Sequence, residues 1–149
     1  MVDFIDYDNP LTTVILKNML LKGKIDCHGD MEVLGTLYGD ISCERYVRIS
    51  GYVEGNVHAR EVLLKKEGEV IGNMQSDYDS VIIGRLKGDL KGENIAVSGE
   101  VEGNITAYGF VRMTEGALVK GDICCAHLIK DENSRIDGSV QLHYSCLQR

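Results

Sequence analysis

Glycine recurs at a regular spacing along almost the whole chain, and this spacing constrains the fold more than any other feature of the sequence. The residues two places before it and two places after it are apolar in every occurrence, and Asn or Asp follows it directly in six of the eight. A short period with the same chemistry in each unit is typical of repeat folds in which like stacks on like. The glycine recurs at intervals of 15 to 18 residues, as Gly23, Gly39, Gly55, Gly72, Gly88, Gly103, Gly121 and Gly138.

Each repeat predicts two short strands that meet at a sharp corner. Apolar and polar residues alternate on both sides of the glycine, as they do in strands with one buried face. Glycine, Asn and Asp are the residues that tolerate a positive φ at such a corner. A third alternating segment precedes each corner, and in residues 81–83 its apolar pair is Val81 and Ile83. Equivalent segments lie at 47–49, 62–64, 95–97 and 111–113.

Three short strands per period favour an all-β fold, a right-handed parallel β-helix (solenoid) of about eight coils. A helical protein is disfavoured because each interior glycine costs up to about 1 kcal/mol relative to alanine, and the chain has 17 glycines in 149 residues. Coil lengths that are not multiples of six favour the right-handed kind over the left-handed hexapeptide kind. We expect an N-terminal tail at 1–12, the β-helix at 13–142 and a C-terminal tail at 143–149. The single proline, Pro10, precedes the first coil, where it removes no ladder hydrogen bond.

Composition excludes several classes of function. The net charge of −7 comes without a basic stripe, which argues against nucleic acid as a partner. No apolar run approaches the roughly 20 residues of a membrane span. The first residues lack the basic region of a secretory signal, so we expect a cytoplasmic protein.

Cysteine, histidine and aspartate are the residue types that could form a catalytic or metal site. Cys27, Cys43 and Cys125 share one position of the repeat with Ala, Ser and Gly, so we expect small buried side chains there, although Cys27 and Cys43 are close enough in the stack for a disulfide. Adjacent Cys124 and Cys125 lack the spacing of a zinc site. The four histidines fall on different coils, and the Asp residues lack the nonapeptide pattern of calcium-binding β-rolls. We therefore expect no catalytic residues, no metal or other cofactor, and no small-molecule substrate. The histidines are His28, His58, His127 and His143.

Three segments make the chain resemble the bactofilin family: 51–57 (GYVEGNV), 68–74 (GEVIGNM) and 99–105 (GEVEGNI), together with Thr13-Val14-Ile15 leading into the first coil. The resemblance extends over about 13–142. It implies a non-enzymatic structural protein that polymerises without nucleotide into cytoskeletal filaments. The resemblance also implies a place at the inner membrane face and a role in cell shape, polarity or envelope organisation.

The ends of a β-helix point to self-association on physical grounds as well. A solenoid closes its sides, but its first and last coils present strand edges that template further pairing. We therefore expect the protein itself to be the main partner, as a homopolymer. The predicted contact residues are apolar members of the terminal coils: Val14, Ile15, Leu21, Ile25, Ile136, Val140 and Leu142.

The sequence leaves two further points open, a membrane contact and the alternatives to a polymer. Phe4 and Ile5 are candidates for a short apolar membrane foot, which would bind weakly in one copy and strongly when a filament displays many. The alternatives to a polymer are a small monomeric or trimeric β-helix binding module, or a trimeric enzyme of the carbonic anhydrase or acyltransferase kind.

Overall fold

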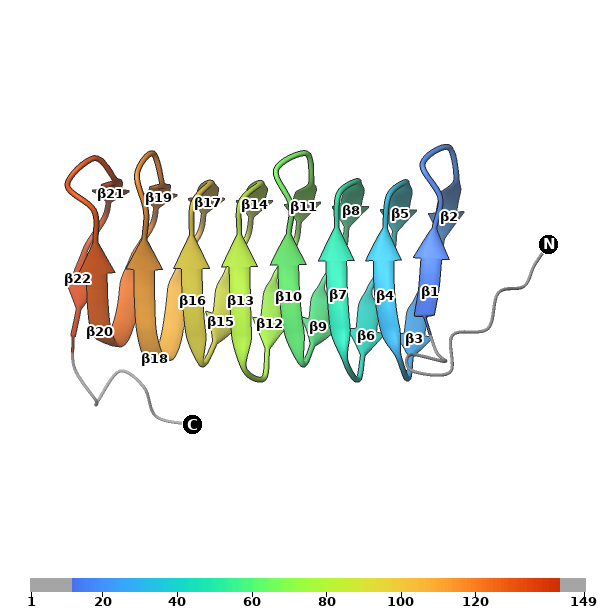
Figure 1. Cartoon of the computed structure of the whole chain (residues 1–149), viewed down its shortest axis with the longest axis horizontal. Helices are drawn as coiled ribbons and strands as arrows, with labels where there is room; N and C mark the ends of the chain where they lie inside the picture. The colour runs from blue at the N-terminus through green and yellow to red at the C-terminus, as the bar shows by residue number, and fades with distance from the viewer. Residues whose placement is uncertain (1–11, 143–149) are drawn as a thin grey trace.

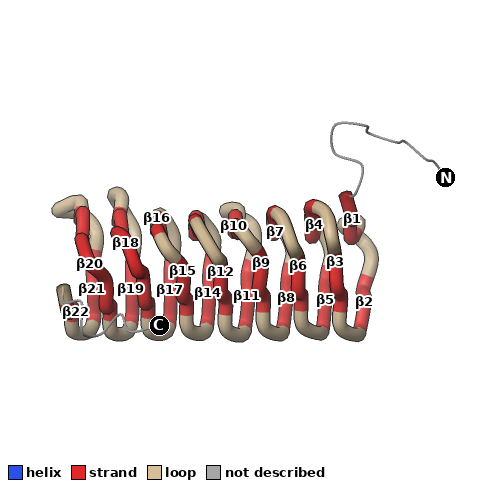
Figure 2. The backbone as a smooth tube through the Cα atoms, turned by 90° about the horizontal axis from the view of Figure 1, so that it is seen from below, coloured by secondary structure: helices blue, strands red, loops and turns tan. Residues whose placement is uncertain are grey.

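The chain winds into a parallel β-solenoid, as Figure 1 shows for a computed structural model that describes residues 12–142. This part of the chain contains 22 strands and no helix, and every strand pair is parallel. Figure 2 shows the coils side by side from below. The all-β solenoid of about eight coils predicted from the glycine period is confirmed.

Strands of equivalent position stack into three columns, one along each side of the solenoid. The first column consists of β1 (Thr12–Ile15), β4 (Asp30–Val33), β7 (Tyr46–Ile49), β10 (Glu61–Leu64), β13 (Asp79–Ile82), β16 (Asn94–Val97) and the later parts of β18 (Ile105–Met113) and β20 (Ile123–Lys130). The second consists of β2 (Leu20–Lys22), β5 (Thr36–Tyr38), β8 (Tyr52–Glu54), β11 (Glu69–Ile71), β14 (Arg85–Lys87), β17 (Glu100–Glu102), β19 (Leu118–Lys120) and β21 (Arg135–Asp137). The third consists of β3 (Ile25–Cys27), β6 (Ile41–Cys43), β9 (Val57–Ala59), β12 (Met74–Ser76), β15 (Leu90–Gly92), the first parts of β18 and β20, and β22 (Val140–Gln141).

The turn of the chain is right-handed. In Figure 1 the chain rises through β1 in front, crosses the top to β2 behind, and returns through β3 while it advances from right to left. The corner between the first and second columns carries longer loops after β1, β10, β18 and β20. These loops lengthen their coils, and the corner between the third and first columns varies as well, with two residues between β12 and β13 but one between β15 and β16.

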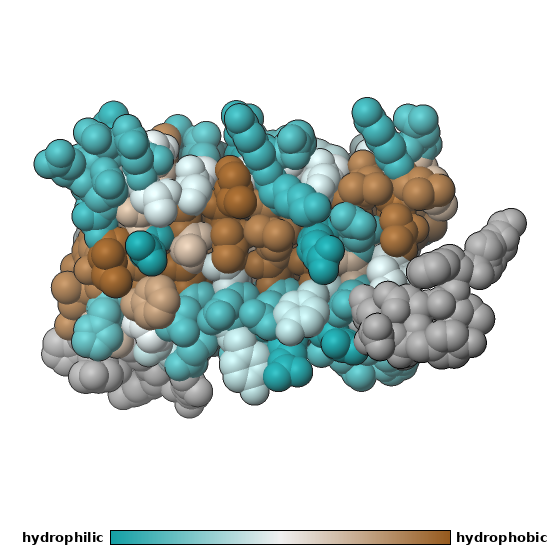
Figure 3. Space-filling view, in the orientation of Figure 1, coloured by the Kyte–Doolittle hydropathy of each residue, from teal (hydrophilic) through white to brown (hydrophobic). Residues whose placement is uncertain are grey.

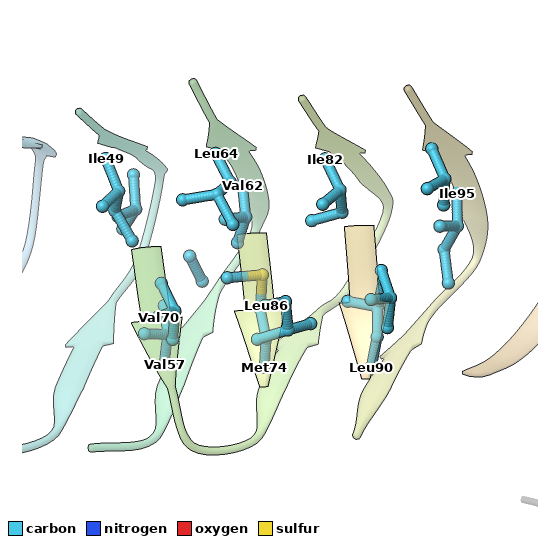
Figure 4. Packing of buried hydrophobic residues seen from close by; sticks show 14 of the residues in the cluster. Ile49, Val57, Val62, Leu64, Val70, Met74, Ile82, Leu86, Leu90 and Ile95 are labelled. Carbon is cyan, nitrogen blue, oxygen red and sulfur yellow. The ribbon is translucent and has the colours of Figure 1, made fainter. Parts of the chain in front are cut away.

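The core is a set of stacked rows of apolar side chains (Figure 4). Val53, Val70, Leu86 and Val101 have no exposed surface, and each lies in register with the next. A row of this kind arises because every coil places the same repeat position toward the inside. Burial of each such side chain stabilises the fold by about 1.5 to 3 kcal/mol, so the repeat supplies its own core.

The prediction for the segment before Gly84 was wrong by one residue. Ser80 and Ile82 are the inward pair of β13, whereas Val81 is only partly buried and Ile83 is exposed. A serine is tolerated inside because its hydroxyl lies 2.6 Å from that of Ser76 in a buried hydrogen bond. The distance to the following glycine indicates the inward pair here, because the buried residues also lie two and four places before Gly35, Gly51 and Gly99.

Candidate functional site

The eight repeat glycines occupy the corner between the second and third columns, as predicted. Each has a positive φ, from 135° at Gly23 to 158° at Gly138. Stacking adds a second demand, because a Cβ on Gly88 would overlap the backbone carbonyl oxygen of Gly72 in the coil before it. Conformation and close approach together therefore require glycine at this corner.

The role predicted for the neighbouring Asn and Asp residues was wrong. No residue other than glycine has a positive φ in the part of the chain that the structure describes. Instead, each Asn or Asp side chain accepts a hydrogen bond from the backbone N–H of the equivalent residue one coil later, at 2.8 to 3.0 Å. We call this row the corner ladder; it runs through Asp40, Asn56, Asn73, Asp89, Asn104 and Asp122 and ends on the N–H of Ser139.

The core rows lose their cover at the N-terminal end of the solenoid. Leu21 and Ile25 are only partly buried, whereas Leu37 and Ile41, the equivalent residues one coil later, are at most 2% exposed. Within residues 12–142, β2 and β3 pair along one edge only. This end therefore presents backbone edges beside incompletely covered apolar side chains.

The C-terminal end is open in the same way. Ile136 is partly buried, although Val119 before it in the same row is completely buried. Val140 and Leu142 are 37% and 56% exposed. On the described part of the chain β21 pairs only with β19. Two of the core rows thus reach the surface at both ends.

The other two residues predicted for the ends lie differently. Ile15 is only 3% exposed and belongs to the core. Val14 is 40% exposed and stands in register with Glu32, in the row of the first column that points away from the core.

Sequence reasoning missed three exposed apolar residues beside the first coil. Leu16, Met19 and Leu20 are 58%, 44% and 58% exposed. Leu20 occupies a position that is polar in most later repeats, including Thr36, Tyr52 and Arg85. The apolar side chain of Leu20 at an outward position was the sign in the sequence that could have identified this surface. These residues enlarge the apolar surface at this end.

The small-residue position behaves as predicted over seven coils. Cys27, Cys43 and Cys125 are buried free thiols, and Leu142, at the same repeat position in the last coil, is exposed. The Cys43 thiol donates a hydrogen bond to the carbonyl oxygen of Gly29 at 2.8 Å. Burial, with the nearby Cys27 thiol as a lesser contribution, raises the pKa of Cys43 to about 11. Such a thiol is protonated near neutral pH and is a poor nucleophile.

The three histidines of residues 12–142 lie on different coils. His28 lies 3.0 Å from Glu44, His58 lies 3.1 Å from Asp77, and His127 is exposed on a separate coil. Residues 12–142 contain no group of three His, Cys, Asp or Glu side chains placed to hold a metal ion. His143 and the proposed membrane foot, Phe4 and Ile5, lie outside the described residues. No helical segment of residues 12–142 is long and apolar enough to cross a bilayer.

Within residues 12–142, closed sides and two partly apolar ends with strand edges that pair on one side only are the features of a self-associating solenoid. The bactofilin family model, described as polymer-forming cytoskeletal, matches residues 13–82 and 64–141. The chain is also 25% identical over 130 residues to Bactofilin BacO of Myxococcus xanthus (strain DK1622), which covers 87% of this chain and 79% of that protein. No solved structure matches this chain. The chain belongs to the bactofilin family of polymer-forming cytoskeletal proteins and is not an enzyme, so the family resemblance is confirmed.

Proposed function

We propose that this chain assembles end to end, without nucleotide, into filaments that organise partner proteins at the cell envelope. The observation that carries the proposal is the loss of burial of the core rows at the terminal coils, at Leu21 and Ile25 on one side and at Ile136 and Val140 on the other. Docking another copy on each end would bury these side chains and continue the parallel strand ladders. Leu142 completes the proposed contact set at the C-terminal end, whereas Ile15 is buried in the core and Val14 lies on the outer face of the first column.

The chemistry of such a contact explains independence from nucleotide. Backbone N–H and C=O groups pair with one another, and apolar side chains exclude water, so the contact needs neither a phosphate group nor a metal. One end contact must outweigh the translational and rotational entropy lost on association. Assembly is therefore expected to depend steeply on protein concentration.

The site of action in this proposal is the cytoplasmic face of the inner membrane. A filament that displays many copies of Phe4 and Ile5 would convert a weak individual membrane contact into a strong collective one. Liposome flotation of the whole chain and of a variant without residues 1–12 tests this part. Equal flotation of the two proteins would refute the membrane foot without affecting the filament.

Electron microscopy of the purified chain, with no nucleotide added, tests the filament itself. We expect filaments from the unchanged protein and none from Leu21→Asp or Ile136→Asp, because a carboxylate in the end contact would lose its hydration without gaining a partner. Val140→Asp is a third variant at a more exposed position, so it disturbs the fold least. Circular dichroism should show the same β content for all of them.

Ile71→Asp is the matched control. Ile71 is a partly buried residue on the outer side of β11, in the middle of the solenoid, so this substitution adds the same charge away from both ends. Filaments are expected to persist in it. Filaments that persist equally in all three end variants would overturn the end contact, and discrete particles from the unchanged chain at high concentration would overturn the filament.

A further inference from the structure

The outer face of the first column carries one uninterrupted row of side chains, which we call the face row. Its members lie in register from the first coil to the last, and none of them points into the core. Figure 3 looks onto this face and shows a brown apolar band along its middle, interrupted by hydrophilic residues. The row consists of Val14, Glu32, Arg48, Leu63, Val81, Ala96, Arg112 and Ile129.

The face row is complementary to a second copy of itself that runs in the opposite direction. Apolar residues then meet at the ends and at the centre, and opposite charges meet at the second position. An exposed apolar residue stands at each end, Val14 at 40% and Ile129 at 54% exposure. Leu63 and Val81 occupy the two central positions, beside a hollow on the surface between β7, β10 and β13. The second residue from one end is Glu32, and the second from the other end is Arg112.

We propose that this face binds the same face of a second copy in antiparallel orientation, about a two-fold axis parallel to the strands. Such an axis places the first coil of one copy against the eighth coil of the other. Val14 then faces Ile129, Glu32 faces Arg112, and Leu63 faces Val81 of the second copy. A parallel arrangement would instead set each coil against itself, with Glu32 against Glu32 and Arg112 against Arg112.

The charges of the face row support the antiparallel arrangement. Within residues 12–142, neither Arg112 nor Arg48 forms an ion pair, so both guanidinium groups are available to a second copy. Glu32 has one cation near it, Lys65 at 3.5 Å, and keeps a second carboxylate oxygen for another.

A second row, flanking the face row, contains the acids Glu61 and Asp79, which would lie opposite each other across the two-fold axis. Arg48 would then lie one coil from Asp79 of the second copy, within the length of its side chain. This arginine offsets the repulsion between the two acids.

The size of the face predicts pairing between filaments rather than between single molecules. Eight coils at about 4.8 Å and four residues at about 3.3 Å give an area near 500 Å² per copy. Two such faces bury about 1,000 Å², the lower limit for a specific interface. In the proposed filament the contact repeats at every subunit, so the strength of the pairing, though not its geometry, rests on the proposed function.

Charge reversal tests the inference by electron microscopy of filament width. We expect paired filaments from the unchanged chain and single filaments from Glu32→Arg and from Arg112→Glu. The double variant should pair again, because the reversed charges face each other once more. Glu67→Arg, in the loop after β10, and Lys87→Glu, on the second column, make the same charge changes on other sides and should leave pairing unchanged.

Cross-linking at high protein concentration decides the arrangement even if the unchanged chain forms no filaments, because a disulfide traps a pair that forms only weakly and briefly. A mixture of Arg48→Cys with Ala96→Cys should give a disulfide-linked dimer on oxidation, above the background of the unchanged chain. Arg48→Cys alone should not, because its copies would stand three coils apart. Cross-linking of Arg48→Cys with itself, or pairing that survives Glu32→Arg, would overturn the antiparallel face. A double charge reversal that stays single would overturn it too, and would leave the face to a lipid surface or a different protein.

Discussion

Replacing Asn104 with Asp should destabilise the fold through charge alone. Asn104 lies in the corner ladder between Asp89 and Asp122; its Oδ1 accepts from the Asp122 N–H at 3.0 Å, and its own N–H donates to Asp89. Aspartate keeps the acceptor oxygen, so the hydrogen bonds survive. The substitution, however, creates three neighbouring carboxylates where the natural order never places two Asp residues on adjacent coils.

The magnitude follows from the spacing of the coils. Two carboxylates at about 4.8 Å repel by about 0.9 kcal/mol in bulk water, and 0.1 M salt reduces this to roughly 0.5 kcal/mol. Asn104→Asp has two such neighbours and should cost about 1 to 2 kcal/mol. Asn56→Asp has only Asp40 next to it and should cost about half of that. The larger cost corresponds to a fall in melting temperature of about 3 to 8 °C.

Thermal unfolding followed by circular dichroism, at low ionic strength, measures the difference. Repulsion raises the folded-state pKa of the new carboxyl, so the penalty exists above that pKa and disappears once the group is protonated. The penalty therefore shrinks as the pH falls through this raised pKa and is absent below the ordinary carboxyl pKa of about 4. The hydrogen bond from the Ser139 N–H lowers the pKa of the neighbouring Asp122, so protonation of the new carboxyl rather than of Asp122 relieves the repulsion. Adding Asp89→Asn to Asn104→Asp should restore about half of the loss.

Two results would refute the reasoning about charge. One is a loss for Asn104→Asp that is no larger than the loss for Asn56→Asp. The other is a loss that stays the same at pH 3 and in 1 M salt. Either would mean that the carboxylate disturbs the ladder geometry rather than its electrostatics.

Three further predictions use the same unfolding assay or simple chemistry. Gly88→Ala should cost about 3 to 5 kcal/mol, from a strained positive φ and overlap with the preceding coil, whereas Gly23→Ala, with open space around it, should cost only the strain of about 1 to 2 kcal/mol. Ser80→Ala should cost about 1 to 3 kcal/mol because it leaves the buried Ser76 hydroxyl without its partner, and the double replacement with Ala should cost less than the two single losses combined. Cys43, with its pKa raised to about 11, should resist maleimide at pH 8 until the chain unfolds, so rapid labelling of the folded protein would contradict its burial.

The repeat pattern predicted most of the fold because every coil obeys the same local rule. An apolar residue two places from each corner glycine must point inward, and Val53, Val70 and Leu86 are completely buried in this way. The prediction failed at 80–82, where Val81 and Ile83 looked more suitable for a core than Ser80. Hydropathy gave the wrong inward pair there, because the buried hydroxyl of Ser76 forms a hydrogen bond with Ser80 and so makes a serine acceptable in the core.

The candidate site was only partly predictable. Leu21 and Ile136 could be named from the sequence because they belong to the first and last repeats. The structure adds that these terminal members of the core rows are less buried than their inner equivalents. Leu20 was not predicted as part of the site, because single apolar residues at outward positions are common on protein surfaces.

The sequence by itself determined the period, the glycine corners and the inward rows, because each depends on residues a few places apart within one repeat. Only the tertiary structure decided what joins one repeat to the next. The hydrogen bond from the Asp122 N–H to Asn104 links residues 18 positions apart, and the face row brings together Glu32 and Arg48 from neighbouring coils. Such contacts exist only once the coils are stacked, since stacking sets which side chains meet and which remain exposed at the two ends.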